Sequence, residues 1–231
     1  MITIIIPIHN KIEYTKQCIN SINMDKIDEI IIVDNNSTED TSGLEINSKV
    51  RIIKLPKNLG FGEACNVALR IAKSEYIYFL NNDTILNKTT ITALLDSIIM
   101  NNLGAVGSKV IYPNGQLIEA GCLVINGKAE RIGHLDSPNK YNEFTIVDYC
   151  SACSLLVRKS LIGDGFDPQF SPGYYEDTDL CMRIKQSGNL VGYEPKSTII
   201  HYELTTSKEL FDPYEMCNKN RVKFMAKWSL H

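Results

Sequence analysis

Short apolar segments alternate with helix-like segments along the first hundred residues of the chain. Four segments have the length and β-rich composition of buried strands, at residues 2–6, 29–33, 50–55 and 76–80. Helical spacing marks the segments between and after them, at residues 12–23, 61–73 and 88–101. Nearly continuous apolar strands joined by helices are typical of a parallel sheet that helices cover on both faces. The chain is therefore predicted to have an α/β fold with right-handed crossovers.

The pattern becomes irregular in the rest of the chain, where short strands and turns follow one another. Asn126-Gly127 lies between two strand-like segments and predicts a hairpin turn. Later segments are expected to form a helix ending at a glycine, two short strands and a last amphipathic helix, at residues 175–188, 191–193, 198–201 and 213–228. No repeat or linker interrupts the sequence, so we predict a single domain over residues 1–231, with halves of about 1–103 and 104–231.

Composition and charge exclude several classes of protein. The net charge of −3 gives no global basic field that would attract nucleic acid. No apolar run approaches the ~20 residues that span a bilayer, and residues 1–7 lack the basic segment and cleavage site of a secretory signal. Seven cysteines, an odd number, then indicate free thiols in a reducing, cytoplasmic compartment. Cys150 and Cys153 have CxxC spacing, but a strand follows them, and we expect both to pack in the core.

Polar side chains follow all four predicted strands, at the edge of the sheet where open α/β proteins bind ligands. These stretches are Pro7-Ile8-His9-Asn10, Asp34-Asn35-Asn36, Lys57-Asn58-Leu59-Gly60-Phe61 and Asn81-Asn82-Asp83. Any one of them fits a solvated loop, whereas the four together favour a crevice for a nucleoside diphosphate. Asp34 is a candidate to accept a hydrogen bond from a base or a ribose, and Lys57 or Arg70 to face phosphate.

Asn81 and Asp83 are two positions apart at the end of a buried strand, so both can reach one point beyond it. A carboxylate beside amide oxygens and water suits a hard divalent cation such as Mg²⁺ or Mn²⁺. His201, at the end of a later strand, is a candidate second ligand. The alternatives are a polar turn after the strand and a histidine with a structural role.

Glu176 and Asp177 begin a predicted helix after the rigid, aromatic sequence Pro172-Gly173-Tyr174-Tyr175. Aromatic residues of this kind line sugar sites, and Asp177 is then a candidate general base for an acceptor hydroxyl. The alternative is that both acids only match the helix dipole, which favours carboxylates in the first turn. Asp179 and Arg183 are four positions apart and are expected to pair on the helix.

Residues 60–65 resemble the glycine fingerprint of dinucleotide-binding enzymes. The third glycine is replaced by Cys65, and Pro56-Lys57-Asn58 separates the segment from its strand. Two βα units also precede it, although that fingerprint usually opens the fold. The dehydrogenase interpretation is therefore disfavoured.

Six motifs, each weak alone, occur in a specific order along almost the whole chain. They are Ile4–Asn10, Ile31–Thr38, Asn58–Gly62, Asn81–Thr84, Tyr175–Leu180 and Ile200–His201. The ordered set resembles a family 2 glycosyltransferase of the GT-A fold, close to the rhamnosyltransferase-like branch. The resemblance implies a Rossmann-like fold with a mostly parallel central sheet. It also implies that residues 1–103 bind the nucleotide sugar and that residues 104–231 form the acceptor-side half and the C-terminal helix.

The resemblance further implies inverting, metal-dependent transfer from a nucleoside-diphosphate sugar, UDP- or dTDP-linked, to a hydroxyl of a glycan or lipid-linked acceptor. Polysaccharide or glycoconjugate assembly would be its setting. Asp177 corresponds to the catalytic base, and Asp83 and His201 would hold Mg²⁺ or Mn²⁺. Glu176, the neighbour of Asp177, is expected to orient the acceptor or to support the loop. The residues implied in nucleotide-sugar binding are Pro7, His9, Asn10, Asp34, Asn36, Lys57, Asn58, Gly60, Phe61, Asn81 and Asn82.

Two departures from the family pattern bear on this site. The first acid of the family's DxD motif is Asn81 here, which implies weaker metal binding or a greater share for Asp83, His201 and the diphosphate. The usual tyrosine before Asn10 is His9, so the stacking surface there differs.

Two other functions stand as alternatives. A sugar nucleotidyltransferase would share the α/β sheet and the metal, but residues 9–13 after the first strand lack the expected glycine-rich loop. A non-catalytic sugar-binding domain would tolerate the loss of Asp83 and Asp177, and both are present.

The last predicted helix is amphipathic and carries lysines at every fourth position, Lys219, Lys223 and Lys227. Its apolar side chains are Tyr214, Cys217, Val222, Met225 and Trp228. We expect most of this apolar side to pack on the domain. The alternative is peripheral contact with anionic lipid at the inner face of the membrane.

Overall fold

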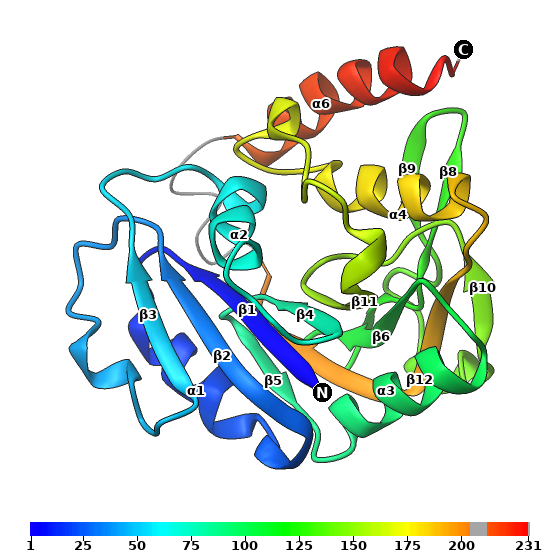
Figure 1. The fold of residues 1–231 in the computed structure, drawn as a ribbon. Helices are drawn as coiled ribbons and strands as arrows, with labels where there is room; N and C mark the ends of the chain where they lie inside the picture. Colours follow the sequence, from blue (N-terminus) through cyan, green and yellow to red (C-terminus); the bar gives the residue numbers. More distant parts are fainter. Residues whose placement is uncertain (204–211, 231) are drawn as a thin grey trace.

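The computed structural model describes residues 1–203 and 212–230, and helices lie on both sides of its central sheet (Figure 1). The helices are α1 (Ile12–Ser21), α2 (Phe61–Leu69), α3 (Thr90–Met100), α4 (Glu176–Gln186) and α6 (Pro213–Trp228). The strands are β1 (Ile2–Ile8), β2 (Ile27–Asp34), β3 (Val50–Lys54), β4 (Tyr76–Leu80), β5 (Thr84–Leu86), β6 (Ala105–Ile111), β7 (Leu117–Glu119), β8 (Cys122–Ile125), β9 (Lys128–Arg131), β10 (Thr145–Val147), β11 (Ser154–Arg158) and β12 (Val191–His201). The predicted alternation of strands and helices is confirmed.

Ten strands form one mixed sheet in the order β10-β12-β6-β11-β4-β1-β2-β3, with β5 paired to β12 and β7 to β6. β3, β2, β1 and β4 pair in parallel. β11 pairs antiparallel with both β4 and β6, so β6 and its parallel neighbour β12 run in the same direction as β1. The carboxyl ends of six strands therefore point toward one edge of a sheet that joins the two predicted halves of the chain.

Apolar side chains cover both faces of the sheet, as the sequence predicted. Ile4 and Ile6 of β1 join α1 and α3 in one core cluster, whereas Ile5 joins α2 and α4 in the other. β4 alternates in the same way, with Tyr78 on the first face and Phe79 on the second. Because these strands are buried on both faces, functional polar groups are placed at their ends, on a rigid support.

Two sequence signals for turns are confirmed. Asn126 and Gly127 join β8 to β9, with Ile125 opposite Lys128, and both turn residues have positive φ angles, 50° and 69°. Helix α4 is followed by Gly188, whose φ is 84°.

Three elements differ from the sequence expectation. A short strand, β5, lies where none was expected. The strand-like segment before Asn126-Gly127 is divided into two strands, β7 and β8, around Gly121, whose φ is 76°. The strands expected at 191–193 and 198–201 form one strand, β12, with a break in its register. The first and third differences follow from pairing with a segment distant in sequence, β5 with β12 and β12 with β6, which local composition does not specify.

Helix α6 lies beyond α4, away from the sheet (Figure 1). Its buried residues are Asn220 and Phe224, and Phe224 packs in a small apolar cluster with Phe170. Of the five apolar residues of the helix, Cys217 and Trp228 pack against this cluster and Met225 lies against Gly127, whereas Tyr214 and Val222 are 80% and 69% exposed. Asn220 and Phe224 mark the buried side of the helix, and Tyr214 and Val222 lie outside that side. No helix in the described part of the chain is long and apolar enough to cross a membrane.

All seven cysteines are free thiols, and six of them are buried, including Cys150 and Cys153 as predicted; Cys217 on α6 is half-buried. Burial raises the pKa of every thiol. We expect a thiol reagent to modify Cys217 rapidly in the native protein and the other six only after unfolding. Mass spectrometry after brief labelling checks this, with Cys217→Ser as the control. Rapid labelling of that variant would contradict the prediction.

Candidate active site

A cleft of about 1070 Å³ lies at the carboxyl ends of the parallel strands. His9 after β1, Asn35 after β2 and Asn81 after β4 line one side of it. Asp177 at the start of α4 and Arg131 at the end of β9 line it from the other half of the chain. Open α/β sheets bind their ligands at this edge, and the size suits a ligand larger than a single sugar.

Asp83 and His201 meet in this cleft. β5 begins directly after Asp83 and pairs antiparallel with the end of β12, which sets Thr84 opposite His201. His201 Nε2 lies 3.1 Å from Asp83 Oδ1 and 3.2 Å from Asn81 Nδ2. Burial opposes charge on the imidazole, but the carboxylate of Asp83 outweighs it, so the pKa of His201 is raised well above its usual value. The structure thus brings together the two residues predicted as metal ligands.

The donors at this point fit a divalent cation. Mn²⁺ accepts carboxylate, amide oxygen and imidazole ligands, and Mg²⁺ prefers the oxygens. In residues 1–203 and 212–230, no three His, Cys, Asp or Glu side chains gather where they could enclose a metal ion. A cation held by Asp83 and His201 would therefore keep coordination positions open to a ligand in the cleft, such as phosphate oxygens.

Glu176 and Asp177 line the same cleft from the first turn of α4. Asp177 Oδ2 accepts from the Ala152 N–H at 3.1 Å, and Oδ1 accepts from the Thr178 N–H at 2.7 Å. Burial raises the pKa of Asp177, although these two hydrogen bonds act in the opposite direction and lower it. Burial, and then the Asp177 charge, raise the pKa of Glu176 well above its usual value. A carboxylate with a raised pKa in a cleft can take a proton from a hydroxyl more readily than an ordinary aspartate.

The loop after β3 is fastened to β2 and to the segment before α4. Asn35 Nδ2 donates to Asn58 Oδ1 at 2.8 Å and to the Gly60 carbonyl oxygen at 3.1 Å. The next N–H, of Phe61, donates to the Pro172 carbonyl oxygen at 2.9 Å. The sequence analysis did not identify Asn35 as this anchor, although it lies between two residues that were proposed as ligands.

Gly60→Ala is expected to lower the stability of the protein. A Cβ at Gly60 would lie 2.6 Å from both the Cα and the carbonyl oxygen of Pro172, and φ is 82° there. With ψ at 176°, this backbone conformation is open essentially to glycine alone and costs roughly 1–3 kcal/mol for alanine. With the clash, we expect the melting temperature to fall by at least about 5 °C, since about 1 kcal/mol shifts a domain of this size by ~2–4 °C.

Thermal unfolding followed by circular dichroism measures this shift. Gly173→Ala is the matched control, because nothing lies within 4 Å of its added Cβ in the neighbouring loop. Equal melting temperatures for the Gly60 and Gly173 variants would disprove the close approach of the two loops.

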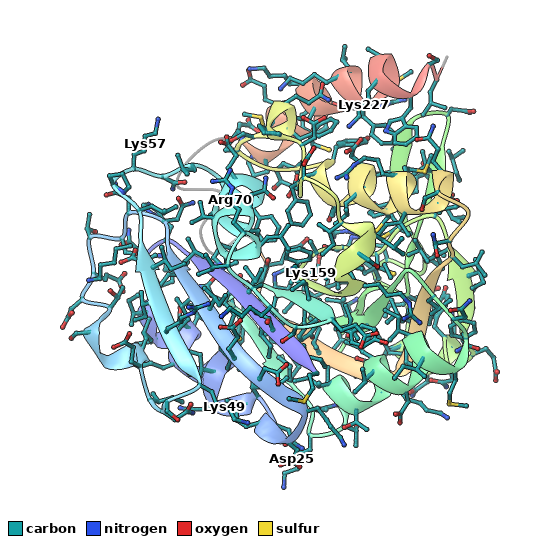
Figure 2. All side chains as sticks on the ribbon, in the orientation of Figure 1. Asp25, Lys49, Lys57, Arg70, Lys159 and Lys227 are labelled. Carbon is teal, nitrogen blue, oxygen red and sulfur yellow. The ribbon has the colours of Figure 1, made fainter. Side chains whose placement is uncertain are left out.

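Most of the other predicted binding residues line the cleft, namely Pro7, His9, Lys57, Asn58, Gly60, Phe61, Asn81 and Asn82. His9 Nδ1 lies 3.0 Å from the Asn35 carbonyl oxygen. Lys57 is exposed, and its side chain points away from the molecule (Figure 2). Arg70, the other cation considered for phosphate, is an exposed residue at the end of α2 and does not line the cleft (Figure 2).

Asn10, Asp34 and Asn36 shape the loop after β2 rather than line the cleft. Asp34 Oδ1 accepts from the Ser37 N–H at 2.8 Å, and Asn10 Oδ1 accepts from the Thr38 N–H at 2.8 Å. Asn36 is exposed, with φ of 67°. The Asp34 carboxylate therefore points into the loop that follows β2, where Ser37 and Thr41 donate hydrogen bonds to it. Its contact with a base stays a prediction.

Helix α6 fastens the segment before α4. Asn220, fully buried, donates from Nδ2 to the carbonyl oxygens of Phe170, Gly173 and Tyr174 at 2.7, 2.8 and 3.1 Å. These carbonyls belong to the turn that leads into Glu176 and Asp177. The position of both acids therefore depends on a side chain more than forty positions later.

Asp179 is a second point of attachment for α6. Its carboxylate is fully buried and pairs with Arg183 Nε at 3.0 Å, which confirms the predicted ion pair on α4. Lys227 and Trp228 of α6 also donate to Asp179 Oδ1, at 2.7 and 3.0 Å (Figure 2 labels Lys227). These charged and polar donors offset the free-energy cost of removing the Asp179 carboxylate from water.

Glu119, Arg131 and Glu203 are among the charged residues in the cleft that sequence reasoning missed. They come from three separate elements, and only Glu203 had a local signal, since it follows His201 by two positions.

A comparison with known families decides where the chain belongs. The family model described as glycosyl transferase family 2 matches residues 3–164. The chain belongs to glycosyltransferase family 2. The rhamnosyltransferase-like branch stays a prediction.

Two relatives of the chain are named for their functions. The chain is 29% identical over 192 residues to the O-antigen biosynthesis protein RfbC of Myxococcus xanthus, covering 76% of this chain and 15% of that protein. It is 23% identical over 217 residues to the pre-mycofactocin glycosyltransferase of Mycobacterium tuberculosis, covering 90% and 44%. The chain thus spans less than half the length of these relatives.

Two solved structures share the fold. GalNAc-T7 with UDP, GalNAc and Mn²⁺ aligns with a TM-score of 0.78 at 14% identity, over 98% of this chain and 48% of that one. The mannosyltransferase PcManGT of Pyrobaculum calidifontis, in complex with GDP-Man and Mn²⁺, aligns with a TM-score of 0.69 at 16% identity, over 98% and 63%. The predicted GT-A fold class is confirmed.

Proposed function

We propose that the protein is a metal-dependent, inverting glycosyltransferase. It moves a sugar from a nucleoside-diphosphate donor, UDP- or dTDP-linked, to a hydroxyl of a glycan or lipid-linked acceptor. One observation carries the proposal: the Asp83–His201 pair and the Asp177 carboxylate line a single cleft. Family membership and Mn²⁺ in two structural neighbours support it. Similarity to an O-antigen biosynthesis protein supports a role in cell-surface polysaccharide assembly.

In this mechanism Asp177 is the base. The acceptor hydroxyl lies beside its carboxylate and gives up its proton to it as the oxygen attacks the anomeric carbon. The new carbon–oxygen bond forms on the face opposite the leaving diphosphate, whose bond to the sugar breaks, so the configuration inverts. Glu176 orients the acceptor. Two amide hydrogen bonds fix the direction of the Asp177 carboxylate before the acceptor binds.

The other side of the cleft binds the donor. Asp83 and His201, with Asn81, would hold Mg²⁺ or Mn²⁺, which when bound neutralises charge on the diphosphate. Pro7, His9 and the loop Asn58–Phe61 line the place proposed for the nucleoside. Asn35 holds that loop in position through the Asn58 and Gly60 contacts.

Metal-dependent nucleotide binding tests the proposal. We expect UDP or dTDP to bind measurably more tightly with Mn²⁺ or Mg²⁺ than with EDTA in isothermal titration calorimetry. Asp83→Asn should weaken this binding by at least about tenfold, because it removes the only carboxylate of the pair. Asp96→Asn, an exposed change on α3, is the control. Equal affinity in metal and in EDTA would refute the metal dependence.

We also propose that the protein works in the cytoplasm, where its seven free thiols would stay reduced. Peripheral contact of α6 with lipid stays a prediction.

A further inference from the structure

The cleft contains a charge network that the proposed mechanism does not use. Arg131, the last residue of β9, donates from Nη2 to Glu203 Oε1, and its Nε lies 3.8 Å from Glu119 Oε2. The Tyr112 hydroxyl donates to the other Glu203 oxygen at 2.6 Å. Glu119, Arg131 and Glu203 all line the cleft, so a ligand there can reach them.

This network lies directly beside the proposed base. Glu119 Oε1 accepts from the Ser151 N–H at 3.1 Å, and Asp177 Oδ2 accepts from the next N–H, of Ala152, at 3.1 Å. The carboxylates of Glu119 and Asp177 therefore accept hydrogen bonds from consecutive backbone N–H groups of one turn. An acceptor that places a hydroxyl at Asp177 has the rest of its ring, or the next sugar, against Glu119 and Arg131.

The groups of this network are oriented before a ligand arrives. Glu119 and Glu203 are 3% and 14% exposed, whereas Arg131 is 37% exposed. The Ser151 amide holds Glu119, and Tyr112 holds Glu203, so neither carboxylate depends on the ligand for its direction. Fixed, planar carboxylate and guanidinium groups can bind the hydroxyls of a sugar as acceptors and donors.

The charge balance of the network disfavours an anion. Its two carboxylates outnumber its one guanidinium, and Asp177 adds a third negative group. An anionic ligand at Arg131 would meet the two carboxylates already paired with it, whereas a hydroxyl or an ammonium group can bind to the carboxylates directly.

Glu176 is an independent indication of the same ligand chemistry. It is 8% exposed and lines the cleft, and its Oε2 has no hydrogen-bond partner among the described residues. A buried carboxylate oxygen of this kind needs a donor. A ligand with hydroxyl or ammonium groups supplies one.

We infer that Glu119, Arg131 and Glu203 form a specificity surface that accepts a neutral or amino sugar next to the reacting hydroxyl and excludes a uronic acid or a phosphorylated sugar. The inference rests on the proposed function in so far as this ligand is the glycosyl acceptor. One unit charge at contact distance in a partly screened site changes affinity by about tenfold.

Ligand-observed NMR measures this selectivity without any need to know the donor. The probes are methyl glycosides in matched sets of neutral, 2-amino and uronic acid forms, in the gluco and galacto series. They are titrated at about pH 6.5, below the pKa of such an amine. In at least one series, we expect the amino sugar to bind at least as tightly as the neutral sugar, and the uronic acid about tenfold more weakly.

Two variants with opposite charge changes separate specificity from a structural role. Glu203→Gln removes a negative charge and should lower the ratio of amino-sugar to uronic-acid affinity about tenfold, whereas Arg131→Gln should raise it. Glu143→Gln, an exposed change outside the cleft, should leave the ratio unchanged. Each ratio is measured within one protein, so partial loss of folded protein does not alter it.

Three outcomes would overturn the inference: tightest binding of the uronic acid, a shift of the ratio in the same direction in both variants, or no binding of any probe. Failure of the proposed function would appear elsewhere, in nucleotide titrations that do not respond to metal.

Discussion

Asp177→Asn is expected to lower kcat by about 10²–10⁴-fold, the usual loss when a general base is removed. Asparagine is nearly isosteric and can still accept the Ala152 N–H, but it cannot take the proton of the acceptor hydroxyl. Because burial raises the pKa of Asp177, its ionised form is less stable in the folded protein than in the unfolded chain. A neutral side chain removes that cost, whereas its amide nitrogen can no longer accept the Thr178 N–H, so we expect the melting temperature to change by only a few degrees, about 1–3 kcal/mol at most. Release of nucleoside diphosphate at saturating substrates measures kcat.

The pH profile provides a second check on the same residue. The base must be ionised, so kcat should fall as the pH falls through the pKa of Asp177. Since burial raises that pKa, the acid limb should lie above the usual aspartate value of about 3.9. The residual activity of Asp177→Asn should lack this limb.

Glu176→Gln is the comparison for both measurements. Wild-type turnover in Asp177→Asn together with an inactive Glu176→Gln would mean that the two roles are exchanged. Full activity of both variants would show that the proposed catalytic site is wrong.

Asn220→Asp is expected to have the largest effect on stability. The substitution replaces the amide donor with an acceptor that faces three carbonyl oxygens, of Phe170, Gly173 and Tyr174. A buried acceptor left without its donor costs about 1–3 kcal/mol, so the total is on the order of 3–5 kcal/mol. At ~2–4 °C per kcal/mol, the melting temperature should fall by about 10 °C.

Thermal unfolding and kcat are to be measured together for this variant. The released turn leads into Asp177, so kcat should also fall at a temperature where the variant is still folded. Asn218→Asp is the matched control, because Asn218 is exposed on the same helix. A melting temperature of Asn220→Asp equal to that of the control would show that α6 does not hold the turn.

Local sequence patterns determined the α/β class and the position of the ligand edge. Apolar strands such as residues 76–80 are recognisable because they are buried on both faces, which requires an unbroken apolar run. The hairpin at Asn126-Gly127 is also local, since it depends on the φ angles that these two residues tolerate. Asp83 and Asp177 stood out as acids at the end of a strand and the start of a helix.

Pairing of distant segments decided which of those polar residues meet. His201 reaches Asp83 because β5 pairs with β12, and nothing near either residue in the sequence encodes that pairing. Asp34 lies at a strand end as predicted, yet its carboxylate turns toward Ser37 in its own loop. A sequence pattern locates a polar residue, but its hydrogen-bond partners decide where its side chain points.

Tertiary structure alone also decided the buried side of α6 and the composition of the charge network. Helical periodicity suggested that Tyr214 and Val222 face the domain, whereas the fully buried positions are Asn220 and Phe224. A polar residue is buried there because three carbonyl groups of a distant turn need its donor, and such a requirement leaves no mark on the helix itself. Arg131 likewise meets Glu203 through contacts between residues 72 positions apart, beyond the range of any local pattern.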